Sequence, residues 1–188
     1  MVQVNLNAPV VLVLAAGRAT RFFASGGQVN KLQANLLGRT VLDHVLRAVE
    51  ASGLAWHVVR SAEGQGMGDS IAAGVRATEH ANGWLVLPGD LPLITSHSLQ
   101  QVAQALAEHA VVLPFYQGQQ GHPVGFNAEC FTQLAALTGE KGAASVVRSR
   151  RADHVLQLDL DDLGIVSDID TLDDLARAAT WLAANSAH

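Results

Sequence analysis

Short apolar runs alternate with amphipathic segments along this chain. The apolar runs are rich in Val and Leu and have the length of buried strands. They lie at about 10–16, 54–59, 84–87, 111–115, 123–126 and 155–158. Between them, apolar residues recur at the spacing of one helix face, in several cases after a residue suited to cap a helix. These helical segments lie at about 41–51, 69–77, 95–108, 128–137, 142–150 and 171–184.

Strands that alternate with helices predict an α/β fold with three layers, in which a mostly parallel sheet has helices on both faces. The run at 123–126 is the candidate for one reversed strand. The chain has 188 residues, which is the length of one domain with a full core. We therefore expect a single domain over residues 1–188, with its core at about 9–184.

Composition narrows the environment and the partners. No apolar run approaches the ~20 residues of a membrane span, and the first residues lack the basic and apolar regions of an export signal. The single cysteine, Cys130, excludes an intrachain disulfide and fits a reducing cytosol. The net charge of −5 argues against nonspecific binding of nucleic acid. We expect a cytoplasmic protein with neither a membrane nor a nucleic-acid partner.

The segment after the first apolar run predicts a triphosphate-binding loop. The run ends in Ala15, Ala16 and Gly17, whose small side chains let a ligand approach the backbone. Ligands of parallel sheets bind outside the carboxyl ends of the strands, where these residues fall. The alternative is a surface turn with solvated arginines. Three cations that could neutralise phosphates follow in this segment: Arg18, Arg21 and Lys31.

Two better-known phosphate loops do not match. Lys31 follows Asn30, so the pattern G-x-x-x-x-G-K-[ST] is absent. The dinucleotide pattern G-x-G-x-x-G begins at Gly64 but has Asp69 in place of its third glycine. A nicotinamide or flavin site is therefore disfavoured.

Two acidic segments supply candidate metal ligands. Asp90 lies in a stiff turn between Pro88 and Pro92, and Asp168 and Asp170 alternate in a later extended segment. Carboxylates at the edge that carries a triphosphate loop are suited to hold phosphate-bound Mg²⁺. We favour Asp90 with Asp170, although either could instead cap a turn or helix. Three further acids are expected to form a solvated edge: Asp159, Asp161 and Asp162.

A glycine-rich segment at Gly66–Ser70 is a candidate base-binding site. Its small residues stand at the start of a helix, where a flat base could stack on the backbone and Ser70 could read its polar edge. The alternative is an ordinary glycine turn with a helix cap.

The pocket for a second substrate is expected at Gly121–Phe126 and Gly139–Ala143, both of which are rich in glycine. The candidate binding residues are Gly121, His122 and Gly142. Taken alone, His122 is more typical of a loop histidine than of a catalyst, and the other histidines lack zinc-binding spacing.

Several motifs, taken together and in order, resemble the molybdenum cofactor cytidylyltransferase branch of the nucleotidyltransferases. The resemblance covers about residues 9–178. It implies a nucleotidyltransferase (Rossmann-like) fold and transfer of CMP from CTP to the terminal phosphate of a molybdopterin-type cofactor, with release of pyrophosphate. It also implies transient contact with a molybdenum hydroxylase of the xanthine dehydrogenase class, which uses the product. The motifs are LAAGRATRF with a later NK, GMGDSIAAGV, LPGDLP, GHPVGF, GEKGA and DIDTLDDL.

The resemblance also implies roles for individual residues. The loop from Ala15 through Arg21 would hold the β- and γ-phosphates, and Lys31 would contact the α-phosphate. Guanylyl-transferring relatives read LAGG where this chain reads LAAG, which favours CTP. The remaining implied roles are the base for Gly68 and Ser70, and Mg²⁺ for Asp90 and Asp170.

Three departures from the family pattern stand out. Phe22–Gln28 is an insertion where relatives often have Met-Gly, and we expect it to lack apolar anchors and to be disordered without ligand. Leu172 stands where a proline is common. Ala144 stands where many relatives carry arginine, so the second-substrate pocket could be adapted to another acceptor.

Two other functions remain open from the sequence. One is a nucleotidyltransferase that uses GTP or another acceptor. The other is a non-catalytic chaperone that binds the cofactor for a molybdenum hydroxylase. The presence of both Lys31 and Asp90 argues against the chaperone, because a carrier has little need of a metal carboxylate opposite a phosphate-binding cation.

Overall fold

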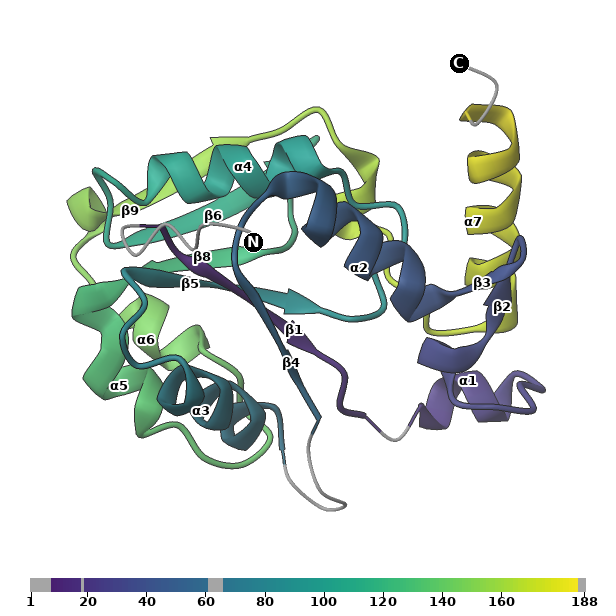
Figure 1. Cartoon of the computed structure of the whole chain (residues 1–188), viewed down its shortest axis with the longest axis horizontal. Helices are drawn as coiled ribbons and strands as arrows, with labels where there is room; N and C mark the ends of the chain where they lie inside the picture. Colours follow the sequence, from purple (N-terminus) through teal and green to yellow (C-terminus); the bar gives the residue numbers. More distant parts are fainter. Residues whose placement is uncertain (1–7, 18, 61–65, 186–188) are drawn as a thin grey trace.

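A mixed sheet of seven strands lies at the centre of the computed structural model, which describes residues 8–17, 19–60 and 66–185 (Figure 1). Six strands follow the order β4-β1-β5-β8-β6-β7, and β9 also pairs with β6. The pairs of β1 with β4 and β5, and of β6 with β9, are parallel, whereas β8 is antiparallel to β5 and β6. The predicted α/β fold and its reversed strand are confirmed. The strands are β1 Val10–Leu14, β4 Trp56–Val59, β5 Gly83–Pro88, β6 Val111–Tyr116, β7 Gln119–Gln120, β8 Val124–Asn127 and β9 Val155–Asp159.

Helices cover both faces of the sheet, as Figure 1 shows. Side chains alternate along β1, so that Val11 and Val13 pack in the cluster that contains α2 and α4, and Leu12 and Leu14 in the cluster that contains α3, α5 and α6. These helices are α2 Val41–Ser52, α4 Ser96–Ala105, α3 Met67–Ala77, α5 Phe131–Ala135 and α6 Ala144–Arg148. Short 3₁₀ turns occur at η1 Lys31–Gln33, η2 Ala128–Cys130, η3 Ala152–His154 and η4 Leu163–Val166.

Capping residues explain where the helices begin. Thr40 caps α2 in a capping box with Asp43, and Gly53 ends this helix with a positive φ of 72°, so that the helix lies where one is predicted at about 41–51. The start of α3 differs from the prediction. The helix begins at Met67, because the carboxylate of Asp69 accepts the N–H of Gly66 at 3.0 Å from the third helical position. Asp69 is therefore the third residue of the helix and accepts the N–H of the N-cap residue, Gly66; it is not itself the N-cap.

A third cluster lies beside the sheet and joins residues 22–41 to the last described helix. It contains α1 Thr20–Ala24, the hairpin of β2 Asn35–Leu36 and β3 Arg39–Thr40, and α7 Leu172–Asn185. Its centre is Phe22, which is 1% exposed and packs in the cluster that includes Ile169 and Ala178. The prediction that the inserted segment lacks an apolar anchor is wrong, because burial of one Phe contributes about 1.5–3 kcal/mol.

The expected solvated edge is also wrong at one position. Asp162 is 8% exposed, and its Oδ2 accepts hydrogen bonds from Thr95 N, Thr95 Oγ1 and Ser98 Oγ at 2.6–3.0 Å. Its Oδ1 accepts the N–H of Gly164 at 2.7 Å. This carboxylate ties the start of α4 to the loop after β9, and Asp162 is therefore a structural residue.

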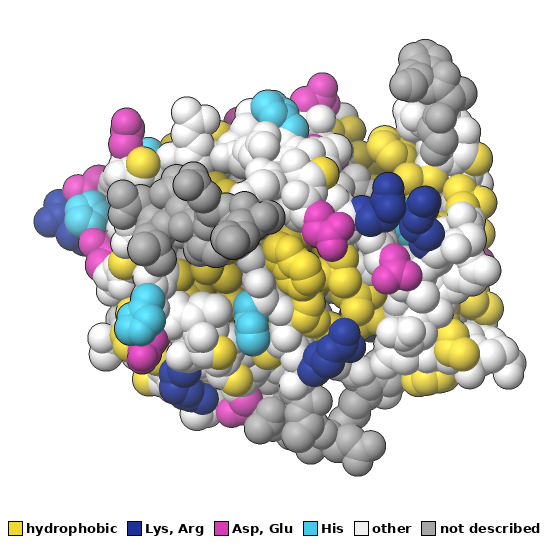
Figure 2. All heavy atoms as spheres, viewed as in Figure 1, with side chains coloured by type: hydrophobic (Ala, Val, Ile, Leu, Met, Phe, Trp, Pro, Cys, Tyr) yellow, Lys and Arg dark blue, Asp and Glu magenta, His cyan; other side chains and the backbone are white. Residues whose placement is uncertain are grey.

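The surface on the face drawn in Figure 2 carries mixed charge. Basic side chains lie there in small groups interleaved with acidic ones. No helix in the described ranges combines the length and hydropathy needed to cross a bilayer.

Replacement of Asp162 by alanine is expected to lower the free energy of unfolding by about 2–4 kcal/mol, because Thr95 and Ser98 lose a buried acceptor and α4 loses part of its cap. Urea denaturation measures this change. Asp161→Ala, at the exposed neighbouring acid, is the control and should unfold within about 0.5 kcal/mol of the wild type. Equal effects of the two substitutions would show that the buried network contributes nothing.

Candidate active site

A cavity of about 720 Å³ lies at the carboxyl ends of β1 and β5. Gly17 follows β1 and Asp90 follows β5, and both line the cavity together with Met67 at the start of α3. Residues from the loops around His122 and Asp168 line it as well. Parallel α/β sheets bind ligands at this edge, so the cavity lies where the fold favours a binding site.

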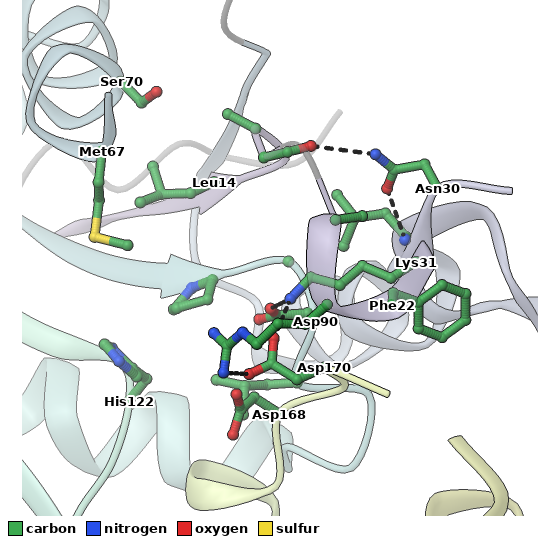
Figure 3. A pocket seen from close by; sticks show the side chains of 18 of the residues that line it. Leu14, Phe22, Asn30, Lys31, Met67, Ser70, Asp90, His122, Asp168 and Asp170 are labelled. Carbon is green, nitrogen blue, oxygen red and sulfur yellow. Dashed lines mark hydrogen bonds and ion pairs between the residues drawn. The ribbon is translucent and has the colours of Figure 1, made fainter. Parts of the chain in front are cut away.

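Charged side chains from three distant segments meet in this cavity (Figure 3). The Nζ of Lys31 lies 2.6 Å from Asp90 Oδ2 and 2.9 Å from Asp170 Oδ1. The Nη1 of Arg21 lies 2.5 Å from Asp170 Oδ2. The cations of the first loop and the acids of two later loops thus face each other across one cavity, as the sequence predicts.

Backbone hydrogen bonds hold these loops together. The N–H of Ile169 donates to the carbonyl of Asp90 at 2.9 Å, which joins the two loops that carry the acids. The N–H of Gly89 donates to the carbonyl of Leu14 at 3.0 Å. Asn30 accepts the N–H of Leu32 through Oδ1 and donates from Nδ2 to the carbonyl of Gly17 at 3.2 Å. The side chain of Asn30 therefore connects the start of the loop to the turn that carries Lys31.

Ion pairing keeps both partners charged. Burial lowers the pKa of Lys31, but the charge of Asp90 and hydrogen bonds to Asp170 and Asp90 more than offset it and raise the pKa above 10.5. Burial likewise raises the pKa of Asp170, but the hydrogen bond and charge of Lys31 and the charge of Arg21 outweigh it, and the pKa falls below 3.8. At neutral pH Lys31 is an ammonium and Asp170 a carboxylate.

Acids outnumber bases in the described part of the cavity lining. Burial raises the pKa of Asp168, and the nearby charges of Asp170 and Asp90 raise it further. The acids are Asp90, Asp168, Asp170 and Glu140, and the bases are Arg21 and Lys31. Both bases pair with carboxylates, so the described lining residues carry no excess positive charge for a triphosphate.

His122 lies on the other side of the cavity from Lys31 and Asp90 in Figure 3. Burial lowers its pKa, while the charge of Asp90 and a hydrogen bond with the backbone of Val86 act in the opposite direction. The ring is therefore neutral at physiological pH. Its Nδ1 is buried without a hydrogen-bond partner, which is unusual for a polar atom.

The glycines of the predicted base-binding segment have a structural role. A Cβ on Gly68 would lie 2.8 Å from the carbonyl oxygen of Thr138 and 2.9 Å from that of Lys141, and Gly68 does not line the cavity. Gly142 is likewise packed against Met67. These glycines allow the loop 138–142 to pack on the start of α3. The prediction that a base stacks on the backbone of this segment fails at Gly68, because protein backbone occupies that space.

The other predicted site residues fall into two groups. Ala16, Gly17, Ser70 and Gly121 line the cavity, although the Oγ of Ser70 donates to the carbonyl of Gly66 at 3.1 Å. Ala15 does not line the cavity. Its backbone N–H donates to the carbonyl of Val59 in β4 at 2.9 Å. Arg18 lies outside the described residues.

Thr20 and Glu140 line the cavity from segments that the sequence predicts to belong to it, although neither was singled out. Sequence reasoning did not assign three other lining residues to the site: Asn30, Gln119 and Gln120. Asn30 alone had a local signal, since asparagine before a helical turn is a preferred cap. The short hairpin of β7 brings the two glutamines to the cavity through its pairing with β6, which no local pattern indicates.

The arrangement of acids fits a divalent cation that is shared with phosphates. In the part of the chain that the structure describes, no group of three or more His, Cys, Asp or Glu is arranged to hold a metal ion. Asp90 and Asp170 nevertheless converge on one cation, the Lys31 ammonium, and Asp90 Oδ1 is buried without a partner. Mg²⁺ in nucleotide enzymes is typically held by one or two carboxylates, with phosphates and water as further ligands.

Comparison with protein families identifies the family of this chain. A family model described as the MobA-like NTP transferase domain matches residues 51–155, more than half of the chain. The chain belongs to this family. It is therefore a nucleotidyltransferase, and Asp90 and the start of α3 fall within the matched region. A search of curated proteins finds no match.

Solved structures agree with this assignment in fold. Rv0371c from Mycobacterium tuberculosis H37Rv is 25% identical with a TM-score of 0.75, covering 93% of this chain and 98% of that one. A manganese complex of Rv0371C is 24% identical with a TM-score of 0.72 and the same coverage. A nucleotidyl transferase from Methanothermobacter thermautotroptrophicus is 18% identical with a TM-score of 0.77, covering 95% of this chain and 99% of that one.

The Lys31→Met variant is expected to be less stable than the wild type at about pH 7, and the difference should narrow only as the pH falls below 3.8, toward about pH 2.5. In the wild type the folded pKa of Asp170 is below 3.8, so its ion pair stabilises the fold above that value and is lost as the pH falls through the folded pKa. The variant lacks this contribution. Urea unfolding at both pH values measures the difference.

Lys141→Met is the matched control, because this second lysine is exposed. It should change stability equally little at both pH values. A destabilisation of Lys31→Met that does not depend on pH would contradict the electrostatic origin of the effect.

Proposed function

We propose that this nucleotidyltransferase transfers CMP from CTP to the terminal phosphate of a molybdopterin-type cofactor and releases pyrophosphate, with Mg²⁺ as its metal. The observation that carries the proposal is the ion cluster of Lys31, Asp90 and Asp170 at the carboxyl edge of the sheet. Such a cluster is what a triphosphate and a divalent cation would need at this position.

A divalent cation is supported by the charge of the cavity. Among the described lining residues, acids outnumber bases, so these residues alone do not neutralise a triphosphate. Asp90 and Asp170 would hold the cation, which supplies positive charge to the phosphates when bound. The manganese complex of Rv0371C, a protein of similar fold, is consistent with such a site.

The proposed reaction is an in-line displacement at the α-phosphorus. An oxygen of the acceptor phosphate forms the new bond, and the bond from the α-phosphorus to the bridging oxygen breaks, so that pyrophosphate leaves. A phosphate monoester is already anionic at neutral pH, so that no strong base is required. Lys31 and Arg21 contribute by neutralising charge and by fixing the phosphates.

Each substrate is assigned to one part of the cavity. The phosphates lie beside Gly17, Arg21 and Lys31, and the base lies toward Met67 and Ser70 on α3. The acceptor lies toward His122, whose unpaired Nδ1 can bond to it, and the neighbouring glutamines. The preference for CTP and for a molybdopterin-type acceptor rests on the motif resemblance, as does delivery of the product to a molybdenum hydroxylase.

A thermal-shift series tests the choice of nucleotide. CTP with Mg²⁺ is expected to raise the unfolding midpoint more than ATP, GTP or UTP does. At equal concentrations, the nucleotide with the lowest dissociation constant stabilises the folded state most. A larger shift with GTP would assign guanylyl transfer instead. No shift with any of the four nucleotides would refute nucleotide transfer.

Lys31→Ala and Asp90→Ala are each expected to lower the rate of pyrophosphate release by at least about 10²-fold, because each removes one oriented charge at the phosphates. A coupled assay for pyrophosphate with CTP and the molybdopterin-type acceptor measures this rate. Arg151→Ala and Asp153→Ala, which break an exposed ion pair, serve as controls. Wild-type turnover in either site variant would refute the mechanism, and binding of the acceptor without any pyrophosphate release by the wild type would favour a cofactor chaperone.

A further inference from the structure

Two features that distinguish this chain from the family pattern meet at one hydrogen bond. The inserted segment 22–28 contains Ser25, and the motif DIDTLDDL has Leu172 where a proline is common. The backbone N–H of Leu172 donates to Ser25 Oγ at 3.0 Å. Proline has no N–H and could not form this bond.

The bond is one of three attachments between α1 with its C-cap and the segment 169–172. Arg21 pairs with Asp170 at 2.5 Å, and the buried Phe22 belongs to the same cluster as Ile169. Ser25, at the C-terminal end of α1, then accepts the N–H of Leu172. The three attachments join residues 21–25 to residues 169–172, so α1 lies beside this loop.

The other side of this loop is also fixed. Asp174 Oδ2 accepts the N–H groups of Asp170 at 3.1 Å and Thr171 at 2.7 Å, and Ile169 donates to Asp90. Asp170 is therefore held on one side by α7, through Asp174, and on the other by the loop after β5, which carries Asp90. Of these hydrogen bonds, the one to Ser25 connects the loop to the C-terminal end of α1. This helix also carries Arg21, which lines the cavity.

We propose that Ser25 is a positioning residue, which through the N–H of Leu172 keeps Arg21 of α1 and Asp170 in register at the phosphate end of the cavity. The insertion thus supports the active site and replaces the rigidity that a proline would supply. This role rests on the proposed function of Arg21 and Asp170 in binding nucleotide and metal. Ser25 itself contacts neither ligand.

The substitution Leu172→Pro isolates this bond. Leu172 is the first residue of α7, where proline is favoured and where the N–H has no partner within the helix. Thr171 Oγ1 accepts the N–H of Asp174 at 3.2 Å, which is the bond of an N-cap residue, and a proline is tolerated after such a residue. The variant should keep or raise the unfolding midpoint, because proline reduces the entropy of the unfolded chain.

The experiment measures the affinity of the full chain for CTP in the presence of Mn²⁺ by calorimetry, alongside the unfolding midpoint. Ser25→Ala and Leu172→Pro should each weaken binding by about threefold to tenfold, the effect of one net hydrogen bond. The double variant should be no weaker than either single variant, because both remove the same bond. Leu172→Ala keeps the N–H and should bind more tightly than Leu172→Pro.

Ser149→Ala is the matched control. Ser149 also caps the C-terminus of a five-residue helix, and its Oγ donates to the carbonyl three residues earlier at 2.7 Å, as Ser25 Oγ does at 2.8 Å. It does not line the cavity and should bind CTP as the wild type does. A loss of affinity in this control equal to that of Ser25→Ala would refute a specific role of Ser25.

Wild-type affinity in both Ser25→Ala and Leu172→Pro, while the wild type binds CTP with Mn²⁺, would overturn this inference alone. Losses that add in the double variant would also overturn it, because the two groups would then act independently. If the wild type binds none of the four nucleotides with Mn²⁺, the proposed function itself fails, and the positioning role fails with it.

Discussion

The Lys31 ammonium between two carboxylates is the interaction on which the site depends. It connects the loop after β1 with the loop after β5 and the segment before α7, which lie far apart in the sequence. Two carboxylates so close together would repel each other without a cation. The chain therefore supplies its own counterion, and the fold is compatible with an empty site.

This internal pairing has a consequence for ligand binding. Lys31 and Arg21 neutralise the acids when no ligand is present, and the same cations are the ones that phosphates require. A divalent cation that takes over Asp90 and Asp170 would release both bases for the triphosphate. In the proposed function, metal and nucleotide therefore assist each other's binding. The metal would pair with the two carboxylates, and the triphosphate would pair with the two bases that those carboxylates release.

The local patterns located most elements because they depend on neighbours in sequence. The helix predicted at about 41–51 is α2, which is bounded by Thr40 and Gly53, and the run 123–126 forms the reversed strand β8. Local reasoning failed where a distant segment decides the role of a residue. Gly68 is small because the loop 138–142 packs against it, and Asp162 is buried because Thr95 and Ser98 lie opposite.

The sequence by itself determined the α/β class, the order of the elements and which loops carry charge, since apolar periodicity and capping act over a few residues. Only the tertiary structure decided which charges meet, because contacts between Lys31 and Asp170 span 139 positions and depend on strand order and packing. The same holds for Phe22, whose burial requires the hairpin and α7 to close around it. Interactions between residues close in sequence thus determine the helices and strands, and packing between distant segments brings the site residues together.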